Sequence, residues 1–200
     1  MTNTNNTLDR EAWLTEASHL IYDDIIAPFA PRPIDRPFRV SVGFPAGSRG
    51  GKTIASCWAS AASADGTNEI FVTPALDNSR DILAAVVHEL IHYSDDCISG
   101  HRGHFARVAR AVGLDGKLTA TYPNDALAAQ LDSYIALLGE IPHAALDAGK
   151  SGKGKQTTRM IKVECDACDF VFRATRKNIE LMPDNACCPA CAIGSLNAAQ

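Results

Sequence analysis

The chain has 200 residues, of which 46% are hydrophobic and 21% charged, and its formal net charge at pH 7 is −4. This length suffices for one compact domain with a small appended module. No apolar run approaches the ~18–20 residues of a membrane span, and residues 1–6 lack the charged and then apolar layout of a secretory signal. We therefore expect a cytoplasmic protein that makes no contact with a membrane.

The first 73 residues predict one helix followed by three strands. Residues 8–26 place apolar side chains at helical spacing, and the proline-rich segment 28–37 ends that helix. Residues 38–44, 52–61 and 68–73 then read as strands, which predicts a small antiparallel sheet. The strand ending near Thr73 is our candidate edge for binding an extended peptide, although an ordinary packed strand fits its sequence equally well.

The segment His88-Glu89-Leu90-Ile91-His92 follows, and it reads as the core of a zinc site on a helix capped by Asn78 or Ser79. Residues four apart on a helix lie about 40° apart around its axis, so both imidazoles can share one metal ion. Glu89 can then take a proton from the water at the open position of the metal. On an apolar helix these three polar side chains are costly unless a bound cation compensates them.

A third ligand is needed to complete a catalytic zinc site, and two histidines follow closely in Gly100-His101-Arg102-Gly103-His104. The glycines allow the backbone to turn back towards the metal before a second amphipathic helix over residues 105–112. We favour His101, with His104 as the alternative.

Two other zinc patterns are less consistent with the sequence. Metzincins need glycine and histidine three and six residues after the motif, where this chain has Asp95 and Ile98. Glu140 could serve as a glutamate ligand, but it follows the helix predicted over residues 124–138 instead of lying within it. A tyrosine could stabilise the tetrahedral intermediate, and the spacing does not choose among Tyr93, Tyr122 and Tyr134.

Several segments together resemble the SprT-like, or Spartan-type, metalloprotease family: Cys57-Trp58, Asp65-Gly66, Asn68-Glu69-Ile70-Phe71-Val72, Pro74, the motif from His88 to His92, His101 and Phe105. The resemblance covers roughly residues 10–142. With its basic linker and ribbon, the chain is similar to the short SprT-like proteins of phages and bacteria. It implies a zincin-like α+β fold with His88, His92 and His101 as zinc ligands and Glu89 as the catalytic acid/base. Arg102 stands where the family has glycine, so His104 stays open as the third ligand.

A second metal site is predicted near the C-terminus. Cys165 and Cys168 form one C-x-x-C pair, and Cys188 and Cys191 form another, with 19 residues between the pairs, which is the pattern of a four-thiolate structural zinc ribbon. Residues 170–174 can form a strand of that ribbon. Cys187 could replace Cys188, although the Cys-Pro-x-Cys form favours Cys188.

The chain contains seven cysteines, an odd number that argues against a disulfide framework. Cys57 and Cys97 stand apart from the ribbon cysteines in the sequence. We therefore predict that both are small buried packing residues in a reducing compartment.

The charge of the chain changes sign along its length. We divide it into a metalloprotease domain over residues 1–145, a flexible linker over 146–157 and a zinc ribbon over 158–200. Residues before 146 include 11 basic and 17 acidic side chains, whereas residues 150–177 include eight basic and three acidic ones. A basic linker and ribbon suggest contact with DNA without sequence reading, and a merely solubilising linker is the alternative.

The sequence therefore predicts a hydrolase with one catalytic and one structural zinc, whose substrates are proteins and, by the family resemblance, proteins bound to DNA. The rival hypothesis is a zinc-stabilised nucleic-acid-binding or regulatory protein that does not cleave proteins. The oligomeric state is left open by the sequence.

Overall fold

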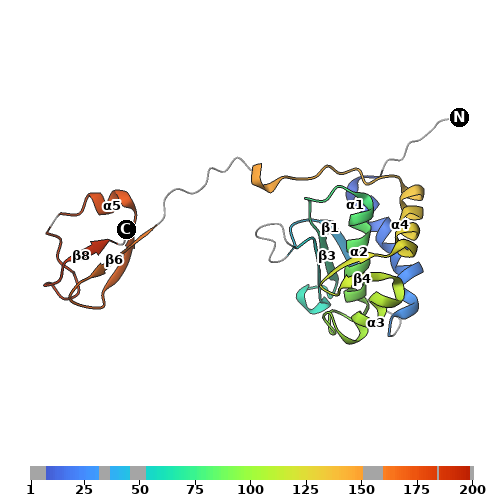
Figure 1. Ribbon diagram of the computed structural model, residues 1–200, viewed down its shortest axis with the longest axis horizontal. Helices are drawn as coiled ribbons and strands as arrows, with labels where there is room; N and C mark the ends of the chain where they lie inside the picture. Colours follow the sequence, from blue (N-terminus) through green and yellow to red (C-terminus); the bar gives the residue numbers. More distant parts are fainter. Residues whose placement is uncertain (1–7, 32–36, 46–52, 151–159, 184, 199–200) are drawn as a thin grey trace. The chain divides into compact units, whose positions relative to one another are not determined.

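The computed structural model describes residues 8–31, 37–45, 53–150, 160–183 and 185–198 (Figure 1). The chain divides into two compact units, residues 1–149 and 150–200, which we call the N-terminal and C-terminal units. This division falls inside the segment predicted as a linker, residues 146–157, of which residues 151–157 lie outside the described ranges. None of the described helices combines the length and apolar character that crossing a membrane requires.

The N-terminal unit alternates helices and short strands. Its elements in chain order are α1 (Arg10–Ile21), the short helical turns η1 (Tyr22–Ile26) and η2 (Ala27–Phe29), β1 (Phe38–Val42), β2 (Ala55–Trp58), η3 (Ser60–Ala62), β3 (Asn68–Val72), α2 (Ser79–Ser94), α3 (Gly103–Val112), β4 (Leu114–Lys117), β5 (Ala120–Pro123) and α4 (Asp125–Leu138). Asp9, Asn78 and Asn124 cap α1, α2 and α4, because each side chain accepts a backbone N–H three residues on. The four helices and the first three strands are confirmed as predicted, within a few residues.

The first sheet differs from the prediction in two respects. Its strand order is β1-β3-β2, with β1 parallel and β2 antiparallel to β3, so the sheet is mixed, not antiparallel. β3 lies in the centre, so the strand ending near Thr73 is not an edge, and β2 takes that position instead. The prediction was wrong because the alternation of apolar residues identifies strands but does not determine which strands pair.

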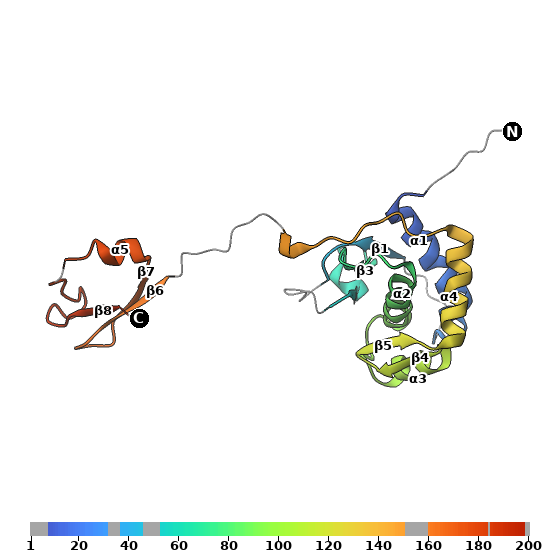
Figure 2. The ribbon, with the colours of Figure 1, turned by 45° about the horizontal axis from the view of Figure 1, so that its top comes forward.

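Three helices pack beside the sheet and form most of the core. α1, α2 and α4 lie side by side, and Trp13, Leu83 and Leu131 are fully buried between these elements (Figure 2). The sequence did not indicate the hairpin β4–β5, which lies along α2 and contacts it through β5. This hairpin and the edge strand β2 therefore flank the helix that carries the histidine motif.

The C-terminal unit is a small three-stranded ribbon. It contains β6 (Ile161–Cys165), β7 (Val171–Ala174), the short helix α5 (Arg176–Glu180) and β8 (Leu196–Ala198), in the antiparallel order β7-β6-β8. β7 confirms the strand predicted at residues 170–174. Among the described residues of this unit only a few side chains are buried, including Val163, Ala174 and Cys188. So small a core needs support from a bound metal or a cross-link.

Asp96 joins the end of α2 to the first sheet. Its carboxylate accepts hydrogen bonds from the backbone N–H of Ser60 at 2.7 Å, from Ser60 Oγ at 2.8 Å and from Asn68 Nδ2 at 2.8 Å. Asn68 is fully buried and also donates to Trp58 O at 2.9 Å. Asp96 has a φ of 58°, in the left-handed region, so these bonds stabilise a backbone conformation that is unfavourable for most residues.

We predict that Asp96→Ala lowers the free energy of unfolding of the N-terminal unit by ~3 kcal/mol. Three hydrogen bonds to a charged group are lost, and the amide of Asn68 stays buried without this acceptor. Both tryptophans, Trp13 and Trp58, belong to this unit. Urea unfolding followed by tryptophan fluorescence therefore measures it directly. Asp115→Ala, at an exposed hairpin position, is the matched control. Equal losses in the two variants would contradict the role given to Asp96.

Candidate metal centre

Three histidines converge at the C-terminal half of α2. His88 and His92 lie one turn apart on that helix, and His101 reaches them from the turn between α2 and α3. His101 Nε2 lies 3.1 Å from His88 Nε2 and 3.3 Å from His92 Nε2. Because these atoms form one cluster, the three imidazoles could hold a metal ion.

The turn that delivers His101 is fixed by its own backbone. The N–H of Cys97 donates to His92 O at 2.7 Å, and the N–H of Ser99 donates to the Asp95 carboxylate at 3.1 Å. Gly100 has a φ of 52°, which suits glycine because it lacks a Cβ. The prediction that glycine turns the chain back here agrees with this geometry.

His104, the alternative third ligand, lies elsewhere. Its Nε2 is 2.7 Å from Ser94 Oγ, and its Nδ1 is 3.1 Å from the Arg107 guanidinium. Glu140 is also remote from the cluster, since it hydrogen-bonds Ser79 at the start of α2. The structure thus brings together His88, His92 and His101, and it groups neither alternative with them.

Phe105 packs against all three imidazoles. It is fully buried, and its ring centroid lies 4.7 Å from that of His88, 4.4 Å from that of His92 and 5.0 Å from that of His101. An apolar ring without hydrogen-bonding groups holds the imidazoles by packing and excludes water from the side that it covers. The position of Phe105, four residues after His101, therefore has a packing explanation.

Burial keeps the histidines neutral. It lowers the pKa of His88 to about 3, with the charges of His92 and His101 acting in the same direction. Burial, together with the charge of His101, lowers the pKa of His92 to about 4, and burial also lowers the pKa of His101. A neutral imidazole has a free lone pair, which is the form that binds a metal.

Glu89 is the buried carboxyl group of the site. Its side chain is only 6% exposed, and burial raises its pKa to about 8, although a hydrogen bond from the backbone N–H of Cys57 acts against the shift. A nearby cation would restore the charged form of this group. The protonation state of Glu89 would therefore change if a cation were bound beside it.

Thr121 is a partner of the site that the sequence did not reveal. Its Oγ1 lies 2.9 Å from His88 Nδ1. If His88 offers the Nε2 lone pair to a metal, its proton is on Nδ1 and is donated to Thr121, which fixes the ring orientation. The two-residue turn of this hairpin falls at Leu118-Thr119, whereas the Asp115-Gly116 pair, which is a hairpin signal, lies within β4, so the sequence did not indicate that β5 would bring Thr121 here.

A cavity of about 440 Å³ opens beside the histidines. His88 and Glu89 form one wall, the edge strand β2 contributes Ala55, and the hairpin contributes Tyr122. Tyr134 donates to Asp24, and Tyr93 packs against Phe38, so of the three tyrosines considered only Tyr122 borders this space. Its volume lies within the range of ligand-binding pockets in proteins.

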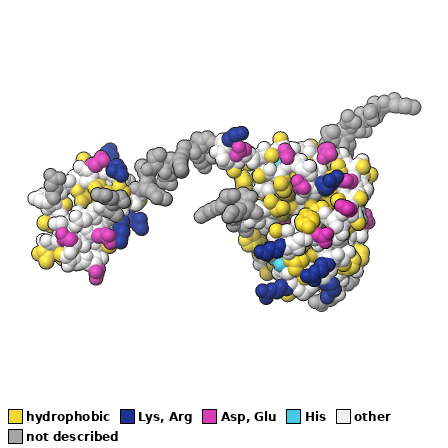
Figure 3. All heavy atoms as spheres, viewed as in Figure 1, with side chains coloured by type: hydrophobic (Ala, Val, Ile, Leu, Met, Phe, Trp, Pro, Cys, Tyr) yellow, Lys and Arg dark blue, Asp and Glu magenta, His cyan; other side chains and the backbone are white. Residues whose placement is uncertain are grey.

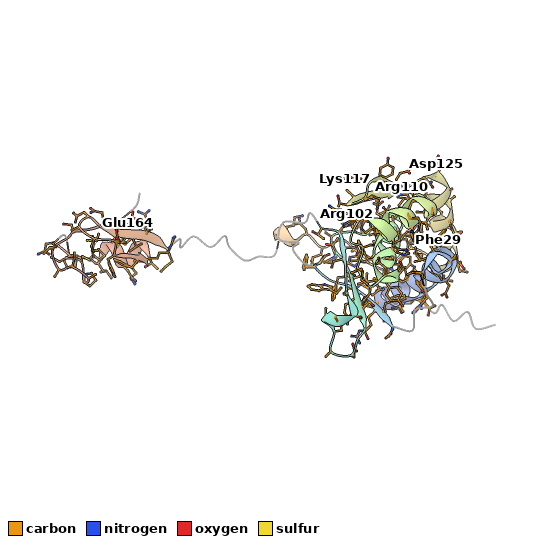
Figure 4. All side chains as sticks on the ribbon, turned by 90° about the horizontal axis from the view of Figure 1, so that it is seen from below. Phe29, Arg102, Arg110, Lys117, Asp125 and Glu164 are labelled. Atoms are coloured by element: carbon orange, nitrogen blue, oxygen red, sulfur yellow. The ribbon has the colours of Figure 1, made fainter. Side chains whose placement is uncertain are left out.

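Basic side chains lie on the surface near α3 and β4. Figure 3 shows them gathered over this end of the N-terminal unit, and Figure 4 labels Arg102, Arg110 and Lys117 there. All three side chains are exposed. They take no part in the hydrogen bonds of the histidine cluster.

The four predicted cysteines of the ribbon also converge. Cys165 Sγ lies 3.7 Å from Cys191 Sγ, and Cys168 Sγ lies 3.7 Å from Cys188 Sγ. Together the four thiols could hold a second metal ion. Cys187 is exposed, and its Sγ is directed to Asn185 O, so Cys188 and not Cys187 belongs to the cluster.

The cysteines of the N-terminal unit differ from the prediction. Cys57 and Cys97 are half-buried, not fully buried, and their Sγ atoms lie 3.6 Å apart. The sequence could not show this, because the two residues are 40 positions apart and meet only where β2 approaches the turn after α2.

Comparisons of the chain with protein families, curated proteins and solved structures find no match.

We predict that Thr121→Val weakens metal binding at the histidine cluster by about 10-fold, because His88 loses the partner that orients its ring. Competition with a chromogenic chelator measures the affinity. Thr119→Val is the matched control, since Thr119 borders the same cavity but is not the partner of His88. An unchanged affinity in Thr121→Val would show that the hydrogen bond does not orient the ligand.

The buried carboxyl group predicts a pH dependence of the metal-free protein. Because the pKa of Glu89 is raised to about 8 from 4.5, the native state keeps a proton that the unfolded state releases. The contribution of this group to stability is therefore full below pH ~4.5 and is lost as the pH rises to 8. Glutamine does not titrate, so Glu89→Gln does not lose this contribution. The free energy of unfolding of the variant, relative to that of the wild type, should therefore rise by about 2–4 kcal/mol from pH 5 to pH 8. Urea unfolding at both pH values tests this, and an equal difference at both would contradict it.

Proposed function

We propose that the protein is a zinc-dependent endopeptidase with a zincin-like N-terminal unit, similar to the SprT-like proteases. The observation that carries this proposal is the convergence of His88, His92 and His101 next to a buried Glu89. Zinc bonds of 2.0–2.1 Å to imidazole in tetrahedral geometry separate two nitrogens by about 3.3–3.4 Å. The separations of 3.1 and 3.3 Å between the Nε2 atoms fit that requirement.

A similar fit supports a structural zinc in the ribbon. Tetrahedral bonds of 2.3 Å to thiolate separate two sulfurs by about 3.8 Å. The Sγ atoms of the two cysteine pairs are 3.7 Å apart. Reduced thiols in both units suit the cytoplasm, where we place the protein.

The residues of the site divide the work of hydrolysis. His88, His92 and His101 hold the metal in their neutral forms, and Thr121 and Phe105 keep the rings aligned. Zinc, when bound, acts as a Lewis acid on the scissile carbonyl and makes water a better nucleophile. Glu89 accepts the proton of the attacking water and then gives it to the leaving amine.

The edge strand β2 provides a place for the substrate backbone. The N–H of Cys57 points to Glu89, away from β3, so Ala55, two residues earlier, points its backbone groups to the same side along the cavity. Among the described strands β2 has no partner on this side, so an extended peptide can pair with it and bring a peptide bond to the histidines. Recognition through the backbone would give little preference for sequence.

The decisive variant is Glu89→Gln. We predict that it keeps the metal and the fold but lowers proteolysis of an unfolded protein such as casein by at least ~10³-fold, because no group takes the proton from water. Metal content and a chelator-treated sample are measured alongside.

His104→Ala, which removes a nearby histidine outside the cluster, should remain active. Proteolysis retained by Glu89→Gln would refute the assignment, and DNA binding without any cleavage by the wild type would favour the rival nucleic-acid-binding protein.

We further propose that the ribbon tethers the protease to DNA. Arg173, Arg176 and Lys177 are exposed on β7 and α5, and Phe170 and Phe172 lie beside them with ring centroids 5.9 Å apart. Both rings and Arg173 border a second cavity of about 590 Å³. Cations bind phosphates and aromatic rings stack on bases, so this surface suits nucleic acid without sequence preference.

The tether predicts that removing Arg173, Arg176 and Lys177 together by alanine substitution weakens DNA binding about 10- to 100-fold at low salt and reduces its salt dependence. Fluorescence anisotropy with labelled single-stranded and duplex oligonucleotides measures both. Alanine substitution of Arg102, Arg110 and Lys117 removes the same charge from the N-terminal unit (Figure 4). Equal losses in both variants, or none in the ribbon variant, would contradict the tether.

A further inference from the structure

Cys57 and Cys97 form a pair of thiols that hydrolysis does not use. Their Sγ atoms lie 3.6 Å apart, at van der Waals contact, and Cys97 Sγ also lies 3.7 Å from Cys57 O. Both side chains are half-buried, so a small reagent can reach them. Two thiols alone do not make a metal site, and within the described ranges neither belongs to a cluster of three or more metal-binding side chains.

The backbone around the pair is already fixed in place. Cys57 lies on β2, which pairs with β3, and its N–H donates to Glu89. Cys97 has a φ of 61°, and its N–H donates to His92 O at 2.7 Å. Asp96, next to it, binds Ser60 at the other side of the same corner. The two side chains therefore meet between segments that the rest of the fold holds together.

We propose that Cys57 and Cys97 are a reversible modification site, at which a small disulfide oxidant converts the two thiols into an intramolecular disulfide. An S–S bond of about 2.05 Å requires the sulfur atoms to approach by roughly 1.5 Å, which rotation about the side-chain bonds can supply. The bond would join β2 to the turn after α2, behind Glu89 and His92. This inference concerns the thiols alone and does not depend on the peptidase activity.

The exchange is balanced with oxidised glutathione as the oxidant. One cysteine thiolate attacks a glutathione sulfur, which forms a mixed disulfide and releases one glutathione. The second cysteine thiolate then attacks the sulfur of the first cysteine and releases the second glutathione. The two protons of the cysteines end on the released thiols, and two electrons pass to the oxidant.

The disulfide would stabilise the N-terminal unit. It closes a loop of about 40 residues, and a cross-link of this span restricts the unfolded chain. We expect the melting temperature of this unit to rise by about 5–10 °C. A dithiol reductant should reverse the rise.

The test uses the full zinc-loaded chain carrying Cys187→Ser, so that the exposed thiol outside both clusters cannot react. The protein is equilibrated over a range of glutathione ratios, alkylated, digested and analysed by mass spectrometry. Melting is followed by the fluorescence of Trp13 and Trp58, which reports the N-terminal unit whatever happens to the ribbon. Cys97→Ser and Cys57→Ala, in the same background, are the controls.

The expected result is a peptide pair linked through Cys57 and Cys97, with a rise in melting temperature that is absent in both control variants. Cysteines that stay free, or carry only glutathione, at the most oxidising ratio would overturn the proposal. A linked pair without the rise, or a rise that persists in the control variants, would also contradict it.

Discussion

The convergence of three imidazoles, with His101 Nε2 3.1 Å from His88 Nε2 and 3.3 Å from His92 Nε2, is the interaction on which the rest of the N-terminal unit depends. Burial lowers the pKa of each ring, which favours the neutral imidazole. A cation between them would use the lone pairs that converge there. The same cation would allow the buried Glu89 to ionise, so one ion would both bind the converging imidazoles and compensate the charge of the buried carboxylate.

The surrounding elements explain how such an arrangement is maintained. α2 supplies two histidines and the glutamate at helical spacing, and Phe105 fills the space beneath the rings. Thr121 approaches from the hairpin β4–β5, and Asp96 fastens the end of α2 to the sheet. Each contact comes from a different element, so the site depends on the packing of the whole unit and not on the helix alone.

Local patterns predicted the elements well. The capped helix around His88, the helix after Gly103 and the two cysteine pairs were all visible from spacing, because these features depend on neighbours in the sequence. The preference for His101 over His104 agrees with the geometry, although the sequence left both open. Pairing between distant segments was not visible, and the parallel pairing of β1 with β3 and the central position of β3 contradicted the expected sheet.

The partners of the site were missed for the same reason. Thr121 and Asp96 are ordinary polar residues in the sequence, and only the folded chain shows that one orients His88 and the other joins α2 to the sheet. Cys57 and Cys97 looked like separate packing residues until the fold placed their sulfur atoms in contact. Residues that carry a motif can be read locally, whereas residues that position a motif depend on tertiary structure.

A crystal structure of the zinc-loaded protein, with an anomalous difference map at the zinc absorption edge, tests the central claim most directly. The account predicts a peak about 2.0–2.1 Å from the Nε2 atoms of His88, His92 and His101, with the Glu89 carboxylate beside the ion but not bonded to it. A map without density at this position, or an oxygen of Glu89 in the fourth coordination position, would contradict it.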